Sequence, residues 1–140
     1  MPARLIDSLA TTEPLADLFS DASILQAMLD FEVALARVEA RLGIIPGAAA
    51  DAIAAAANPA AFDLSDLSRK SLRAGTPTIP FSKALINVVR SKDEPATAFV
   101  HWGATSQDVS DTALVLLLKR AAHLLEADLA RAERALHAVS

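Results

Sequence analysis

Residues 100–120, VHWGATSQDVSDTALVLLLKR, join a polar, hydroxyl-rich run directly to a strongly apolar one. Thr105 and Asp108 have the spacing of a capping box, with Asp in place of the usual Glu or Gln, so a helix is expected to begin at about Ser106. The apolar residues that follow then belong to that helix. Since other segments also carry helical spacing and no segment alternates cleanly as a strand would, the sequence predicts an all-α fold.

The composition favours helices that pack closely through small side chains. Hydrophobic residues make up 53% of the 140 residues, alanine is abundant, and only four residues are glycine. This apolar content, with a mean hydropathy of +0.34, excludes a chain that is disordered throughout. The length suits one domain or a piece of a larger one.

Charge and cysteine content exclude several classes of function. The net charge is −4 and the pI is about 5.3, so the basic footprint of a nucleic-acid-binding protein is missing. The scattered lysines and arginines form no membrane-surface patch, and Lys119, Arg120 and His123 interrupt the most apolar run, residues 113–125. The lack of cysteine excludes disulfides, thiolate metal sites and a cysteine nucleophile. We expect a cytoplasmic protein with no nucleic-acid or membrane partner.

Caps and breakers divide the chain into predicted helices. Residues 1–20 contain two prolines and several hydroxyl residues and are expected to be irregular. A helix capped by Ser20 or Asp21 is expected to end at Gly43. Further helices are expected at 48–57, from Asp63 or Ser65 to about 73 with Gly75 as its stop, at 81–90 and from 106 onward, with a rigid loop at 76–80 and a surface turn at 91–97.

The last predicted helix is apolar over more than one stripe. Its apolar residues include Leu114, Val115, Leu116, Leu117, Leu118, Leu124 and Leu125. A helix that is apolar on most sides should be buried on most sides, and the other predicted helices are too short to cover it. We therefore expect that the chain associates with further helices or other subunits, and that it is a piece of a larger helical protein.

The start of this helix is a candidate anion site. The first N–H groups of a helix have no partner within it and lie at the positive end of its dipole. Hydroxyls of Thr105 and Ser106 add donors, Gly103 allows close approach of the backbone, and His101 and Trp102 are expected to form a wall. Taken alone, such a cluster is more often only a cap, and a single histidine or tryptophan is more often structural.

Three segments resemble a known enzyme superfamily. VHWGATSQDVSDTA, residues 100–113, resembles the first signature block of the fumarase/aspartase superfamily, and within it the cycloisomerases that act on 3-carboxy-cis,cis-muconate. FSDASILQAMLDFEVALARVEARLGIIP, residues 19–46, resembles the first long helix of these enzymes. AGTPTIPFSKAL, residues 74–85, resembles their next active-site-facing loop. Together the three segments extend the resemblance over nearly the whole chain.

The resemblance implies an architecture. It implies an N-terminal helical domain at 1–100, and at 101–140 the signature block with the start of a central bundle helix. In such enzymes the bundle assembles a homotetramer, and each active site combines segments of three subunits. The implied reaction is the reversible lactonisation of 3-carboxy-cis,cis-muconate in protocatechuate catabolism, with a small tricarboxylate substrate and no cofactor.

The resemblance also implies roles for particular residues. Substrate contacts are expected from His101, Thr105, Ser106, Gln107 and Thr78. Asp108 is expected to serve mainly as a cap. No catalytic residue is expected within this chain, because the mobile serine loop and the second histidine block of such enzymes do not occur in it. No metal ligand is expected either, because His123 and His137 on the last predicted helix are expected to lack carboxylate or histidine partners at i±4. The chain alone is therefore expected to be inactive.

Two departures bear on the alternatives. An adenylosuccinate lyase-like enzyme would carry a His-Asp pair where this chain has Thr78-Ile79, and an Arg-Tyr pair where it has Arg4-Leu5. Both differences disfavour a purine-nucleotide substrate. A non-catalytic helical assembly module that keeps the fold and the anion pocket is the alternative from a different class.

Overall fold

The structure is a computed structural model that describes residues 7–139, and the side chains of residues 9–139. All regular structure in this range is helical, which confirms the predicted all-α class. The elements are α1 (Asp7–Ala10), α2 (Glu13–Leu18), α3 (Asp21–Arg41), α4 (Gly47–Ala56), η1 (Pro59–Ala61), α5 (Leu64–Ala74), α6 (Thr78–Arg90), η2 (Pro95–Phe99) and α7 (Ser106–Val139).

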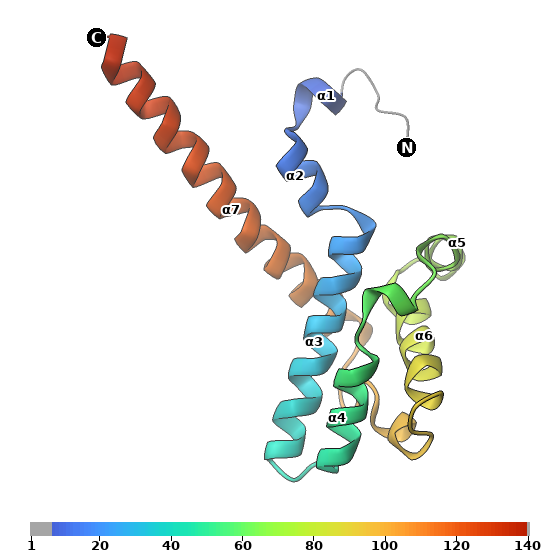
Figure 1. Cartoon of the computed structure of the whole chain (residues 1–140). Helices are drawn as coiled ribbons and strands as arrows, with labels where there is room; N and C mark the ends of the chain where they lie inside the picture. Colours follow the sequence, from blue (N-terminus) through green and yellow to red (C-terminus); the bar gives the residue numbers. More distant parts are fainter. Residues whose placement is uncertain (1–6, 140) are drawn as a thin grey trace.

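Helix α3 lies at the centre of the fold, packed against both α7 and α4 (Figure 1). Its predicted start is confirmed, because the Ser20 hydroxyl caps it by accepting the Ser23 N–H at 3.3 Å. Its predicted stop is also confirmed, since Gly43 adopts a φ of 72°, a left-handed conformation that suits glycine. The loop that follows folds α4 back beside α3.

A single hydrophobic core joins the helices. Helices α5 and α6 pack against each other, and α6 also contacts α4 and α7. Three of the four buried residues of α4 are alanines, Ala49, Ala50 and Ala56. The largest fully buried apolar side chains come from four helices and include Leu25 and Leu29 of α3, Ile53 of α4, Phe81, Leu85 and Val89 of α6, and Val109 and Leu117 of α7.

Two sequence-based boundaries were wrong. Residues 7–18 contain α1 and α2 rather than irregular chain. Pro14 stands in the first turn of α2, where its missing N–H costs nothing, and Glu13 suits the positive helix start, so these residues initiate a helix rather than break one. In the same way α6 begins at Thr78, three residues before the predicted start, with Pro80 in its first turn.

Helix α7 extends well beyond the body of the fold (Figure 1). Only one stripe of it is buried, formed by Val109, Ala113, Leu117 and Ala121. Leu114, Val115, Leu118 and Leu125 are each about half exposed, so most of its apolar surface has no cover within residues 9–139. No helix in the described part of the chain is both long and apolar enough to cross a membrane.

Candidate functional site

The signature segment forms a complete capping box at the start of α7. The Asp108 carboxylate accepts the Thr105 N–H at 2.7 Å and the Thr105 hydroxyl at 2.8 Å. The Asp108 N–H in turn donates to the Thr105 hydroxyl oxygen at 3.4 Å. The backbone N–H and then the hydroxyl of Thr105 hold the pKa of Asp108 below its usual value. The predicted cap and the predicted helix start are therefore confirmed.

This cap decides which donors remain for a ligand. The Thr105 hydroxyl and N–H both bind Asp108, so they are engaged within the chain. The N–H groups of Ser106 and Gln107 stand in the first turn, where the helix itself offers no acceptor. They lie at the positive end of the 34-residue α7, together with the Ser106 hydroxyl. The helix start thus keeps a small group of donors suited to a carboxylate.

His101 is held by a buried carboxylate from a distant part of the chain. Its Nδ1 lies 2.7 Å from Oε1 of Glu32, which is 1% exposed on α3. His101 also has a φ of 60°, a left-handed conformation that is uncommon for residues other than glycine. Such backbone strain persists where the surroundings fix the residue, and it is enriched at ligand sites. The side chain of His101 is 18% exposed, so the ring is fixed by Glu32 but remains partly accessible to solvent.

A second buried carboxylate, Glu39, lies on the same helix. It is 7% exposed, and its Oε2 has no hydrogen-bond partner within the described residues. A Cβ atom added at Gly103 would meet Glu39 Oε1 at 3.9 Å, so Glu39 reaches the signature loop. Burial raises the pKa of Glu39. Burial also raises the pKa of Glu32, against the opposing charge and hydrogen bond of His101.

The remaining predicted site residues occupy different positions around α7. Thr78 is fully buried, and its hydroxyl lies 2.7 Å from the hydroxyl of Ser110, so it joins the start of α6 to α7. Gln107 is exposed, and its side-chain amide donates to Asp111 at 2.6 Å. His101, Thr105, Ser106 and Gln107 are thus brought together in one segment. Thr78 stands behind that segment.

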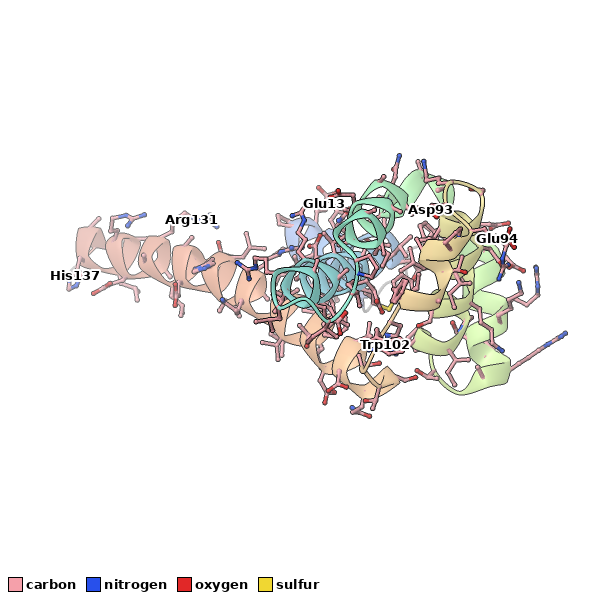
Figure 2. All side chains as sticks on the ribbon, turned by 90° about the horizontal axis from the view of Figure 1, so that it is seen from below. Glu13, Asp93, Glu94, Trp102, Arg131 and His137 are labelled. Atoms are coloured by element: carbon pink, nitrogen blue, oxygen red, sulfur yellow. The ribbon has the colours of Figure 1, made fainter. Side chains whose placement is uncertain are left out.

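Trp102, His123 and His137 do not join the buried contact between His101 and Glu32. Trp102, labelled in Figure 2, is 48% exposed. Its ring contacts that of Phe99, with 6.0 Å between the ring centroids. His123 and His137 were expected to lack carboxylate partners at i±4, and this was wrong for His137, whose Nε2 lies 3.9 Å from Oε1 of Glu133. The Nδ1 of His123 lies 3.6 Å from Oε2 of Glu126, three residues further along α7. Within residues 9–139, no three histidine or acidic side chains gather as metal ligands would.

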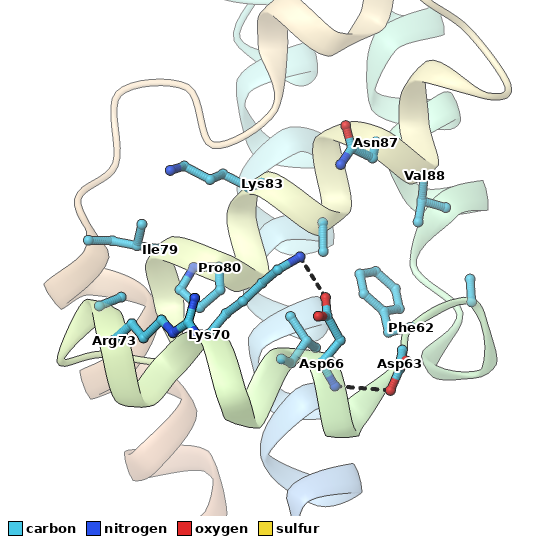
Figure 3. A pocket seen from close by; sticks show the side chains of 14 residues that line it. Phe62, Asp63, Asp66, Lys70, Arg73, Ile79, Pro80, Lys83, Asn87 and Val88 are labelled. Carbon is cyan, nitrogen blue, oxygen red and sulfur yellow. Dashed lines mark hydrogen bonds and ion pairs between the residues drawn. The ribbon is translucent and has the colours of Figure 1, made fainter.

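A groove with a volume of about 640 Å³ lies between α5 and α6 (Figure 3). It is lined by apolar side chains such as Phe62 and Pro80 and includes no residue of the signature segment. Lys70 and Asp66, both on α5, form an ion pair at 2.6 Å on one wall of the groove (Figure 3). The groove therefore forms no part of the candidate site.

Sequence reasoning missed Glu32 and Glu39, although the pattern contained a signal for them. Leu25, Glu32 and Glu39 recur every seven residues, so they share the stripe of α3 that also buries Leu29 and Ala36. An acidic residue on an apolar stripe must find a partner or shift its protonation. Two of them in one stripe indicate a polar site beneath a helix that otherwise forms core.

The fold and the capped signature segment define an all-helical chain of the fumarase/aspartase type. A family model described as lyase matches residues 9–140, and the chain belongs to this lyase family. It is 52% identical, over 80% of its length, to a 3-carboxy-cis,cis-muconate cycloisomerase of Bradyrhizobium diazoefficiens. It is 44% identical, over 94% of its length, to a nitrosuccinate lyase of Streptomyces davaonensis.

A solved structure supports the same relationship. The 3-carboxy-cis,cis-muconate lactonizing enzyme from Pseudomonas putida matches 91% of this chain with a TM-score of 0.85 and 45% identity. The resemblance inferred from residues 19–46, 74–85 and 100–113 is therefore confirmed. The chain spans only 25% of the Bradyrhizobium relative, 28% of the Streptomyces relative and 29% of the Pseudomonas chain.

Proposed function

We propose that this chain is the N-terminal part of a cycloisomerase that reversibly lactonises 3-carboxy-cis,cis-muconate to carboxymuconolactone in protocatechuate catabolism. The observation that carries the proposal is the match to the Pseudomonas putida lactonizing enzyme, at 45% identity and a TM-score of 0.85. The 52% identity to the Bradyrhizobium cycloisomerase supports it further. The donors at the start of α7 supply the chemistry that a substrate with three carboxylates needs.

In the proposed reaction, a carboxylate oxygen of the substrate adds across a carbon–carbon double bond and a proton adds to the neighbouring carbon. Negative charge then develops on another carboxylate, and preorganised donors stabilise it. We assign carboxylate binding to His101, Ser106 and Gln107, with the dipole of α7 behind them. Thr105 contributes mainly through its capping box with Asp108, which fixes the start of α7 and so the positions of Ser106 and Gln107. Thr78, fully buried against Ser110, supports the segment from behind.

The proposed enzyme is a cytoplasmic homotetramer without a cofactor, in which α7 begins a central bundle. The division into a helical domain at 1–100 and a signature block with bundle helix at 101–140 belongs to this proposal. The apolar residues left exposed on α7 support it, because a bundle would cover them. Since the proton-transfer groups are expected in segments outside this chain, we propose that the 140-residue chain alone is inactive.

A lyase acting on a different small carboxylate is a second candidate. The chain is 44% identical to a nitrosuccinate lyase, a value close to its 45% identity with the Pseudomonas enzyme. Binding of a carboxylate at the start of α7 would serve an elimination as well as a lactonisation. An adenylosuccinate lyase-like activity is disfavoured because Thr78-Ile79 replaces a His-Asp pair, while Arg4-Leu5 lie outside the described residues. A non-catalytic assembly module remains the alternative without activity.

The test is turnover by this chain and by a longer version that carries the missing family blocks. The ultraviolet absorbance of 3-carboxy-cis,cis-muconate is followed, with adenylosuccinate and nitrosuccinate assayed in parallel. We expect the longer version to consume the muconate and the 140-residue chain to leave it unchanged. Consumption of nitrosuccinate alone would establish the second candidate. Turnover by the short chain would contradict the proposed inactivity.

A further inference from the structure

The contact between His101 and Glu32 joins two parts of the chain that are 69 residues apart in sequence. It brings the signature loop onto the middle of α3, the helix that contacts α7 and α4. The two atoms, Nδ1 and Oε1, lie 2.7 Å apart, a distance typical of a charge-assisted hydrogen bond. Because α3 is packed on both sides, it offers a rigid base for the ring.

The surroundings of Glu32 leave it few other partners. Glu32 is 1% exposed, and His101 is its only hydrogen-bond partner within residues 9–139. The charged groups that interact with this pair are Glu39 on α3 and Asp108 on α7, both of them acidic. A buried carboxylate without a donor would be strongly unfavourable, so the contact fixes Glu32 and His101 together.

We propose that Glu32 is a positioning residue for His101. It accepts the proton on Nδ1 and orients the ring, so that Nε2 is the nitrogen available to the anionic part of a ligand at the start of α7. This inference rests on the proposed function for the identity of the ligand. The contact itself does not depend on that identity.

The chemistry of the two side chains explains why this arrangement suits an anion. An ionised carboxylate can only accept, so the nitrogen facing Glu32 must carry a proton. The other nitrogen is then a donor only when the ring is protonated, and an arriving carboxylate favours that state. Glu32 therefore compensates one side of an imidazolium while the ligand compensates the other. If Glu32 were instead protonated and donated to Nδ1, the proton of the neutral ring would lie on Nε2.

The test is the protonation pattern of the histidine rings, measured by nitrogen-15 NMR on the labelled 140-residue chain at neutral and alkaline pH. The chain contains three histidines, so His123 and His137 on the exposed part of α7 serve as internal references. We expect His101 to show a proton on Nδ1 that exchanges slowly with water. A neutral His101 ring with its proton on Nε2 would overturn the proposal.

Substitutions separate the hydrogen bond from mere packing. Glu32→Leu replaces the carboxylate with an apolar side chain of similar size. Because the acceptor is removed, the fixed Nδ1–H signal of His101 should be lost. Glu32→Gln restores an acceptor oxygen and should restore that signal. Glu39→Gln is the matched control, because it changes a buried glutamate seven residues further along the same stripe of α3 that does not hydrogen-bond to His101. Circular dichroism verifies that each variant is folded. An unchanged His101 signal in folded Glu32→Leu would contradict the proposal.

Kinetics on the longer version separate this inference from the proposed function. Loss of the hydrogen bond should raise the KM for the muconate on the order of tenfold, with a smaller change in kcat. If the longer version turns over the muconate and folded Glu32→Leu leaves KM unchanged, the positioning role is wrong and the function stands. If the ring pattern is as expected but the muconate is not consumed, the proposed function is wrong and the role of Glu32 stands.

Discussion

At the scale of single residues, Glu39 is a buried carboxylate that its surroundings compensate incompletely. It lies beside the signature loop, and its Oε2 has no hydrogen-bond partner among residues 9–139. Glu39→Gln removes the buried charge and keeps the shape of the side chain. We expect the variant to unfold at higher denaturant concentration at pH 7, with a gain on the order of 1 kcal/mol in the free energy of unfolding.

The pH dependence of this gain gives a sharper check. Because burial raises the pKa of Glu39 above its ordinary 4.5, the folded chain binds that proton more tightly than the unfolded chain does. The contribution of the carboxyl group to stability is therefore full below pH 4.5 and is lost as the pH rises through the raised pKa. The advantage of Glu39→Gln should be largest at neutral pH and shrink toward pH 4.5. Asp51→Asn is the control, because it removes a carboxylate charge at an exposed position of α4.

At the scale of elements, the start of α7 depends on one hydroxyl. The Thr105 hydroxyl donates to the Asp108 carboxylate and accepts from the Asp108 N–H. Thr105→Val removes both bonds without changing the size of the side chain, and we expect a loss of about 1 kcal/mol in the free energy of unfolding by denaturant. Ser106→Ala is the control, since Ser106 stands outside the capping box. An equal loss in both variants would show that the box contributes nothing specific.

The cap also predicts how acid acts on the start of α7. The bonds from Thr105 hold the pKa of Asp108 below its ordinary 3.8. The unfolded chain binds that proton more tightly, so this contribution to stability is present above pH 3.8 and is lost as the pH falls through the lowered pKa. Asp108→Asn should therefore be less stable than the native chain at pH 6 and nearly equal to it at pH 2. A constant difference in thermal unfolding across that range would contradict this.

The two faces of α7 should respond differently to the same truncation. Leu117 is 2% exposed in the core, whereas the neighbouring Leu118 is 49% exposed. We expect Leu117→Ala to lower the free energy of unfolding by about 2–5 kcal/mol, since a cavity remains in the core. Leu118→Ala should change it by no more than about 0.5 kcal/mol in dilute solution. Similar losses in urea unfolding would mean that α7 packs in another register.

The sequence predicts most helix boundaries, but it does not predict which face of α7 is buried. Caps and stops at Ser20, Gly43 and Gly75 are local chemistry, and the helices begin and end where these residues place them. Pro14 misled because a proline breaks a helix interior but suits a first turn, and the local pattern does not state which applies. Hydrophobicity likewise does not identify which leucines of α7 are buried, since that depends on where α3 crosses it.

The candidate site was predictable only where it is contiguous in sequence. Thr105 and Asp108 are three residues apart, and their spacing alone predicted the cap that the structure contains. The partner of His101 lies 69 residues away on α3, and only the folded chain brings it into contact. The tertiary structure was therefore needed to identify Glu32 as the partner of His101, although an acidic residue on an apolar stripe is unusual.

At the scale of the whole molecule, the exposed apolar face of α7 predicts association. Leu118 and Leu125 are about half exposed and Leu129 is 69% exposed, on a helix that extends away from the body (Figure 1). Because contiguous apolar surface of this kind seldom stays in water, we expect light scattering to give a mass of two or more 14.7 kDa chains at micromolar concentration. Leu118→Lys combined with Leu125→Lys should shift the population toward the monomer, because a buried lysine in such an interface would lack a partner. His123→Lys adds the same side chain at an exposed polar position of α7 and should leave the mass unchanged. A native chain that stays monomeric throughout would show that this face has no partner in a second copy.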